Sequence, residues 1–344
     1  MFGLNRLFGV PVSAVWQAQT GDHVIALAWS PDGRVLAVAG AAGGVWALDA
    51  ADGRARHALR GHAFGATAVA WLTSSALVSA GQDGLVRVWD ADTGAERRAL
   101  AAPGQWVQTV AVSPGGAFLA AAAGKGVRVW DAEGRTVRDH TDHPSTVADL
   151  AWEPNGTDLV AAAYGGLTRW SAARAEPLDR YSWKGSVLRV SWSPDGRVLA
   201  TGNQDATAHC WVLARAADLK MYGYRRKVTE LSWDRTARFL ATNGGPRVTV
   251  WDCSGAGPEN TRPVVLAAHD ETGHVTAVAF QPAGPLLATG GSDGRVYLWL
   301  HDRTTAPLGE CRFAAPVSRL AWSPDGKLLA VGTDAGAVAV VKIG

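Results

Sequence analysis

Two groups of histidines beside carboxylates are the residues of this chain best suited to bind a metal ion. Each group has acidic residues between two histidines: His140, Asp142 and His143 in one, and His269, Asp270, Glu271 and His274 in the other. Imidazole nitrogens with carboxylate oxygens could bind Zn²⁺ or Ni²⁺. Each group lacks two further ligands within reach, however, so a structural role for these histidines is the alternative interpretation.

Sequence signals of catalysis are missing. A catalytic site needs a nucleophile, a base and a stabilising group that meet in one pocket. The chain has no GxSxG motif, no phosphate-binding loop and no HExxH motif. Glycine-rich stretches such as residues 40–44 lie between predicted strands rather than before a helix, so they indicate turns. We therefore predict no enzymatic activity and no cofactor.

The elements that position these side chains follow a repeat. Large or apolar residues recur about every 41 positions: Trp29, Trp71, Val112, Trp152, Trp192, Trp233, Phe280 and Trp322. The first copy predicts four short strands, over residues 24–30, 34–39, 45–49 and 54–59, with a Pro-Asp-Gly turn after the first strand. A period of this length indicates one small sheet repeated many times rather than one continuous core.

Several copies end their third predicted strand in Trp-Asp, as at Trp89-Asp90, Trp130-Asp131 and Trp251-Asp252. With these residues the chain resembles the WD40 family of β-propellers over nearly its whole length. The resemblance implies a buried hydrogen-bonded set of His, Ser or Thr, Asp and Trp in two copies: His62, Ser79, Asp83 and Trp89 in the second, and His269, Thr289, Asp293 and Trp299 in the seventh. The fifth copy has Trp183 where the histidine is expected. Copies without the full set are expected to depend on apolar packing.

Eight copies predict an all-β, eight-bladed WD40 β-propeller, and a seven-bladed ring with one displaced copy is the alternative. The last copy has only three strands before the chain ends, whereas a strand-like segment, residues 13–19, precedes the first copy. We expect this N-terminal strand to complete the last blade and close the ring, which leaves only short edges. Residues 1–12 would be an N-terminal tail, and residues 13–344 a single propeller domain.

Charge and hydropathy argue against several classes of partner. Lys and Arg number 33 and Asp and Glu 31, for a net charge of +2, and no basic run exceeds three residues. The chain therefore lacks the cluster of Lys and Arg residues that is typical of a nucleic-acid-binding protein. No stretch approaches the roughly 18 apolar residues of a membrane span. Three cysteines without CxxC spacing suit a reducing compartment, so we expect a cytoplasmic protein. We also expect a monomer. The Ala, Gly and Arg content suggests a bacterial source.

The WD40 resemblance implies that residues at the start of each first strand line one face around a central channel. Tyr164 and Gln204, in the loops between the second and third strands of copies four and five, are expected on the same face. We expect a partner protein to bind this face through Trp106, Tyr164, Arg189, Gln204, Lys227, Glu230, His274 and Arg319. Asp149, Arg189 and Glu230 alternate in sign across three neighbouring copies. They form either a chain of mutual salt bridges, of little energetic value if exposed, or a charged contact patch for the partner.

Trp106 is the expected anchor of this surface. It lies outside the two columns of tryptophans that we assign to packing between blades, in a loop on the expected binding face. Large aromatic side chains and arginines dominate interface energetics, although Trp106 could instead cover an apolar gap. We expect Trp106→Ala and Arg189→Ala to weaken capture of the partner with little loss of stability.

We therefore expect a non-catalytic WD40 scaffold that mediates protein–protein interaction. The first alternative is an accessory protein in metal handling, with a histidine-bearing face that would use His140, His143, His269 and His274. The second alternative is an enzyme with a site at the mouth of the channel.

Overall fold

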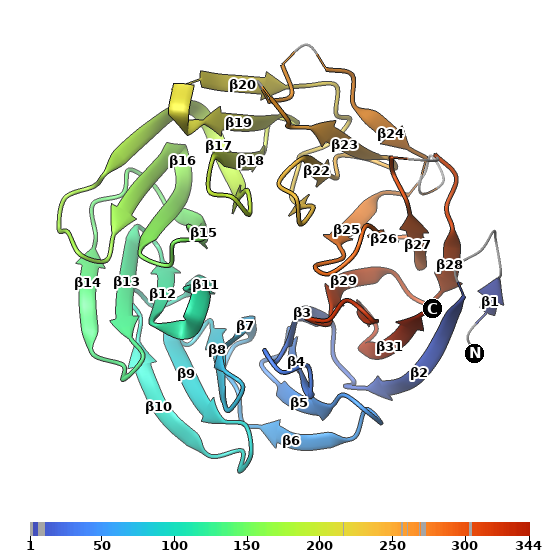
Figure 1. Ribbon diagram of the computed structural model, residues 1–344. Coiled ribbons are helices and arrows are strands. Elements are labelled where there is room, and N and C mark those ends of the chain that lie inside the picture. The colour runs from blue at the N-terminus through green and yellow to red at the C-terminus, as the bar shows by residue number, and fades with distance from the viewer. Residues whose placement is uncertain are drawn as a thin grey trace.

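Short antiparallel strands are arranged around a central axis, so that the chain forms a ring (Figure 1). The computed structural model describes residues 3–5, 11–215, 217–255, 257–259, 261–267, 269, 273–302 and 305–344. Helical structure in these ranges is limited to two 3-10 turns, η1 (Pro114–Gly116) and η2 (Leu213–Arg215). The predicted all-β class is confirmed. None of the helices in the described ranges is long and apolar enough to cross a membrane.

The first three sequence copies each form a four-stranded antiparallel sheet. The first sheet contains β3 (Val24–Trp29), β4 (Val35–Gly40), β5 (Val45–Asp49) and β6 (Ala55–Leu59). The second contains β7 (Ala66–Thr73), β8 (Ala76–Gly81), β9 (Leu85–Asp90) and β10 (Glu96–Ala101). The third contains β11 (Val107–Val112), β12 (Phe118–Ala123), β13 (Gly126–Asp131) and β14 (Thr136–His140).

The number of sheets differs from the prediction. Across the described ranges the ring contains seven sheets, so counted by its sheets the propeller is seven-bladed and the prediction of eight blades is wrong. The fourth and fifth copies share one six-stranded sheet. Its strands are β15 (Val147–Trp152), β16 (Asp158–Ser171), β17 (Asp179–Trp192), β18 (Val198–Asn203), β19 (Ala208–Val212) and β20 (Ala217–Met221).

Two long strands produce this merger. β16 and β17 each have 14 residues, about twice the length of their counterparts in other copies. Part of β16 pairs with β15 and part with β17, and β17 continues directly into its pairing with β18. Gly165 and Gly166, at φ 99° and 125°, bend the backbone without interrupting the strand. The two halves of the sheet pack on each other across Leu167, Trp192 and Trp211.

The remaining strands complete the ring in three sheets. One contains β21 (Leu231–Trp233), β22 (Phe239–Thr242), β23 (Val248–Asp252) and β24 (Val264–Leu266). The next contains β25 (Val275–Phe280), β26 (Leu287–Gly291), β27 (Arg295–Trp299) and β28 (Gly309–Arg312), with β1 (Gly3–Asn5) paired to β28 as a fifth strand. The last contains β29 (Val317–Trp322), β30 (Leu328–Thr333), β31 (Ala337–Ile343) and β2 (Val12–Gln19).

The two ends of the chain meet in this last sheet. β2 pairs antiparallel with β31, from Val12 opposite Ile343 to Gln19 opposite Ala337 (Figure 1). Trp16 of β2 is buried, and its indole Nε1 donates a hydrogen bond of 2.8 Å to the carbonyl of Ala50 in the first copy. The N-terminal strand therefore connects the last and first sheets and closes the ring.

Local turn chemistry explains where the strands end. Ser30 Oγ accepts hydrogen bonds from the backbone N–H groups of Arg34 and Val35, at 3.1 and 3.0 Å, and donates one to Asp32. Gly33 has a φ of 70°, which a residue with a side chain rarely adopts. The Ser-Pro-Asp-Gly sequence thus reverses the chain between β3 and β4. At Ser193 and Ser323 the serine again donates to the turn aspartate and accepts from the first backbone N–H of the next strand.

Tryptophans on the innermost strands join neighbouring copies. In five copies the indole N–H donates to the carbonyl of the residue before the equivalent position in the preceding copy: Trp29 to Ala321, Trp71 to Ala28, Trp152 to Ala111, Trp192 to Ala151 and Trp322 to Ala279. The bond from Trp29 to Ala321 spans the closure of the ring at 2.9 Å. The periodic residues that predict the repeat therefore also hold its copies together.

Candidate functional site

The predicted buried set of the second copy is assembled in the structure. His62 lies between Asp83 and Ser79, with ring-nitrogen distances of 2.9 Å to Asp83 Oδ1 and 2.8 Å to Ser79 Oγ. Trp89 Nε1 donates to the same hydroxyl at 2.9 Å. Burial lowers the pKa of His62 below its ordinary 6.5, although Asp83 opposes this shift. A Cβ at Gly81 would lie 2.3 Å from the His62 ring, so this set requires glycine there.

The set of the seventh copy forms two hydrogen-bonded pairs. His269 Nδ1 lies 2.8 Å from Asp293 Oδ1, and Trp299 Nε1 donates to Thr289 Oγ1 at 3.0 Å. In the fifth copy, the Trp183 ring packs against His209 with centroids 3.9 Å apart. These side chains are buried or half-buried between strands, so they belong to the framework rather than to a surface site.

The candidate metal ligands are engaged in packing and hydrogen bonds. The His140 ring stacks on Trp170 with centroids 3.8 Å apart. His143 Nδ1 lies 3.0 Å from the carbonyl of Lys125, and Trp170 Nε1 donates to His143 Nε2 at 3.1 Å. Burial lowers the pKa of both histidines. No group of three or more potential ligands occurs in the described part of the chain, and Asp270 and Glu271 lie outside it.

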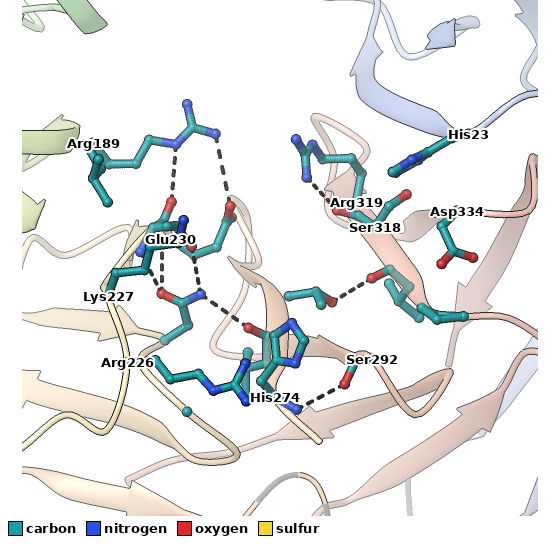
Figure 2. Close-up of a pocket in the computed structure, with 18 of the residues that line it drawn as sticks. His23, Arg189, Arg226, Lys227, Glu230, His274, Ser292, Ser318, Arg319 and Asp334 are labelled. Carbon is teal, nitrogen blue, oxygen red and sulfur yellow. Dashed lines mark hydrogen bonds and ion pairs between the residues drawn. The ribbon is translucent and has the colours of Figure 1, made fainter. Parts of the chain in front are cut away.

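A cavity of about 710 Å³ opens at the mouth of the central channel (Figure 2). It is lined by the inner strands β17, β25 and β29 and by loops between the second and third strands or between successive copies. Because the strands of each sheet alternate in direction, these two kinds of loop emerge on one side of the ring, which we name the channel-mouth face. Five of the eight predicted contact residues line the cavity: Arg189, Lys227, Glu230, His274 and Arg319.

Arg189 connects an acidic residue of the preceding copy, Asp149, with one of the following copy, Glu230, and Figure 2 shows its contact with Glu230. Its guanidinium lies 3.4 Å from Asp149 Oδ1 and 4.0 Å from Glu230 Oε1, and its Nε donates to the carbonyl of Thr229 at 3.2 Å. Desolvation raises the pKa of Asp149 and of Glu230, while the positive charge of Arg189 opposes both shifts. The alternation of sign in the sequence thus produces a chain of ion pairs. Arg189→Ala would leave two carboxylates without this partner, so it is expected to lower stability as well.

Asn243 holds the loop that carries Glu230. Its Oδ1 accepts hydrogen bonds from the backbone N–H groups of Thr229 and Glu230 at 2.9 and 3.0 Å. Its Nδ2 donates to Thr229 Oγ1 and to the carbonyl of Val275. The first strand of this copy, β21, has only three residues, so a side chain supplies contacts that strand pairing supplies elsewhere. Glu230 is therefore fixed in position before any ligand binds.

Exposed aromatic side chains of several copies lie on the channel-mouth face. Trp106, just before β11, and Tyr164, in the bend of β16, are 53% and 57% exposed, as expected of contact residues. Phe64 and Tyr222, in the loops before the first strands of the second and sixth copies, are 85% and 77% exposed. Sequence reasoning missed these two, although each lies in the same kind of loop as Trp106. Phe64 also has a φ of 67°, which is unusual for a bulky residue.

The other predicted contact residues occupy the same face. Gln204 is exposed in the loop between β18 and β19 and Lys227 in the loop between β20 and β21, whereas Arg319 and His274 are half-buried at the cavity. The His274 backbone N–H donates to Ser292 Oγ at 3.0 Å, and burial, with Arg226 nearby, lowers the pKa of its ring. An imidazole that is neutral at pH 7 can act as donor and acceptor, but the cavity shows no hydrogen bond between it and a nucleophilic side chain in the described ranges.

Comparison with known proteins identifies the repeat. The sequence profile described as "WD domain, G-beta repeat" matches residues 95–131, 177–212, 261–299 and 308–340, and that described as "Anaphase-promoting complex subunit 4 WD40 domain" matches residues 4–74. The two profiles together match more than half of the chain. The crystal structure of the computationally designed Ika8 protein is similar in fold, with a TM-score of 0.82 over 96% of this chain and 99% of that chain at 21% identity. The chain belongs to the WD40-repeat family.

Proposed function

We propose that this protein is a non-catalytic scaffold that binds a partner protein on its channel-mouth face. The distribution of exposed apolar side chains is the observation that supports this proposal. Large hydrophobic residues are exposed at six described positions, and the four aromatic ones, Phe64, Trp106, Tyr164 and Tyr222, all belong to this face. The other two, Val15 and Val265, lie on the outer strands β2 and β24. Exposed aromatic residues that share one face of a protein are typical of protein interfaces.

The ring makes these side chains suitable anchors because their backbones are held by strands on both sides. Trp106 directly precedes β11, and Tyr164 pairs with Ser186 within the six-stranded sheet. Little conformational entropy is then lost when the face binds, which favours affinity. The three cysteines are free and buried, which supports a reducing, cytoplasmic environment for the scaffold.

A capture experiment tests the proposal. The tagged wild-type protein, a Trp106→Ala/Tyr164→Ala double variant and a Val15→Ala/Val265→Ala control are incubated with lysate of the native host, and bound proteins are quantified by mass spectrometry. We expect the aromatic variant to recover less than about a tenth of the specific partner, because hot-spot aromatics each contribute on the order of 2 kcal/mol. Equal recovery by all three proteins would exclude this face as the binding surface.

A further inference from the structure

The channel-mouth cavity carries an excess of positive charge. Among its lining residues, Arg189, Arg226, Lys227 and Arg319 are cationic, whereas only Glu230 and Asp334 are anionic. Arg189 is already paired with Glu230 and with Asp149 behind it. The remaining cations therefore determine which ligand the cavity can accept.

Arg319 is the most incompletely paired of these cations. Its one hydrogen bond in the described structure runs from Nη1 to the carbonyl of Ser318, at 2.7 Å, and it makes no ion pair within 4.0 Å with a described residue. Its side chain is half-buried, and Figure 2 shows the guanidinium directed into the open part of the cavity between Arg189 and His23. Desolvation lowers the pKa of Arg319 despite the attraction of Glu230. Several N–H donors of a desolvated cation thus face the cavity.

Arg226 and Lys227 extend this positive region to the rim. Both side chains are exposed, and neither forms an ion pair with a described residue. They follow Tyr222 in the same loop, so this loop carries an exposed aromatic ring as well as the two cations. Such a combination matches a polypeptide that carries carboxylates beside apolar residues.

We propose that the partner presents an extended acidic peptide segment, one carboxylate of which enters the cavity and pairs with the Arg319 guanidinium. This inference rests on the proposed function and names the chemistry of the partner. A guanidinium offers parallel N–H donors that match the two oxygens of a carboxylate. Neighbouring carboxylates of the same segment meet Arg226 and Lys227 at the rim. The cavity volume of about 710 Å³ is sufficient for several side chains of such a segment.

A peptide fits this cavity better than a nucleic acid does. The chain has a formal net charge of only +2, and the cations are confined to one site rather than forming a stripe that could follow a phosphate backbone. Glu230 and Asp334 at the same cavity would repel closely spaced phosphates. A single carboxylate at Arg319 brings less negative charge near these two residues than a row of phosphates does.

Fluorescence anisotropy with defined probes tests the inference. The probes are a fluorescein-labelled peptide of alternating Glu and Gly, the matching Lys-Gly peptide, and an oligothymidylate of equal charge. We expect the Glu-Gly peptide alone to bind. Arg319→Gln should weaken its binding by about tenfold, as expected for loss of a charge-assisted bidentate pair. Arg319→Lys should lie between the two because it keeps the charge but not the planar fork.

Two further variants separate the site from general charge. Arg226→Gln/Lys227→Gln should weaken binding by about fivefold and make it less sensitive to salt, since rim charges act over a screened distance. Arg54→Gln removes one positive charge from a side chain that is 88% exposed on the opposite face, between β5 and β6, and should leave binding unchanged. Thermal melts of each variant check that folding is retained.

Three outcomes would overturn the inference: equal affinity for the Lys-Gly peptide, tighter binding of the oligothymidylate, or no loss of affinity in the folded Arg319→Gln variant. The scaffold proposal is judged separately by the aromatic double variant. Loss of partner capture in that variant, with no binding of the Glu-Gly peptide, would reject the acidic segment and leave the scaffold proposal in place.

Discussion

Trp16 provides a sharp test of how the ring is closed. Its side chain is 8% exposed, packs among Leu48, Val338 and Val340, and donates a 2.8 Å hydrogen bond to the carbonyl of Ala50. Trp16→Ala would remove this contact between β2 and the first copy. Loss of a buried tryptophan costs about 3–5 kcal/mol, and the unpaired buried carbonyl adds about 1 kcal/mol. We therefore expect the free energy of unfolding to fall by about 4–6 kcal/mol.

The control for this experiment is the same substitution at an exposed position. Trp106 is 53% exposed and makes no indole hydrogen bond with a described residue, so Trp106→Ala should cost less than about 1 kcal/mol. An unfolding entropy of about 2.1 cal/mol/K per residue corresponds to about 0.7 kcal/mol per kelvin for 344 residues. The expected decrease in Tm is then about 6–8 °C for Trp16→Ala and about 1 °C for Trp106→Ala. Calorimetry and urea denaturation measure both, and equal stability of the two variants would refute the role of Trp16 in closure.

Four more perturbations test the framework. Trp89→Ala should lower the free energy of unfolding by about 3–5 kcal/mol, measured by urea denaturation, because it empties a buried site and removes the donor to Ser79. Deletion of residues 1–19 removes β2 and exposes the edge of β31, so light scattering should show aggregation, and a monomer of unchanged stability would contradict the closure. Acidification from about pH 7.5 to about pH 5 should lower Tm. Burial lowers the pKa of His62 and His143 below 6.5, so the unfolded chain binds more protons than the folded chain in this range. The stability that these histidines contribute above pH 6.5 is therefore lost as the pH falls. Arg189→Ala should lower the free energy of unfolding at pH 7 and lower it less in acid. The pKa of Asp149, already raised by burial, rises further without the guanidinium, and protonation then removes the unpaired charge. A loss of unfolding free energy that does not change with pH would argue against this pairing.

Much of the framework could be predicted from the residues themselves. The strands, their turns and the packing tryptophans follow from local chemistry, as at Ser30, Asp32 and Gly33, where side-chain hydrogen bonds and a positive φ reverse the chain. The His62 set was predicted from the resemblance to the WD40 family, whose motif its four members match within one copy. Interactions within one repeat can be predicted from the sequence because the groups that interact are close along the chain.

The number of sheets could not be predicted in this way. The repeat period counts copies, whereas a sheet is defined by which strands remain hydrogen-bonded to one another. Gly165 and Gly166 allow β16 to bend without a break, and β17 continues from one copy into the next. Whether a bend interrupts pairing depends on the positions of both neighbouring strands.

Sequence alone determined that this chain forms repeated antiparallel sheets in the WD40 pattern, with tryptophans between copies. Tertiary structure decided the sheet count, the pairing of Arg189 with Asp149 and Glu230, and the exposure of Phe64 and Tyr222. The physical reason is distance along the chain. Arg189 meets a carboxylate from the preceding copy and another from the following copy, and the exposure of a loop residue depends on everything that the ring places around it.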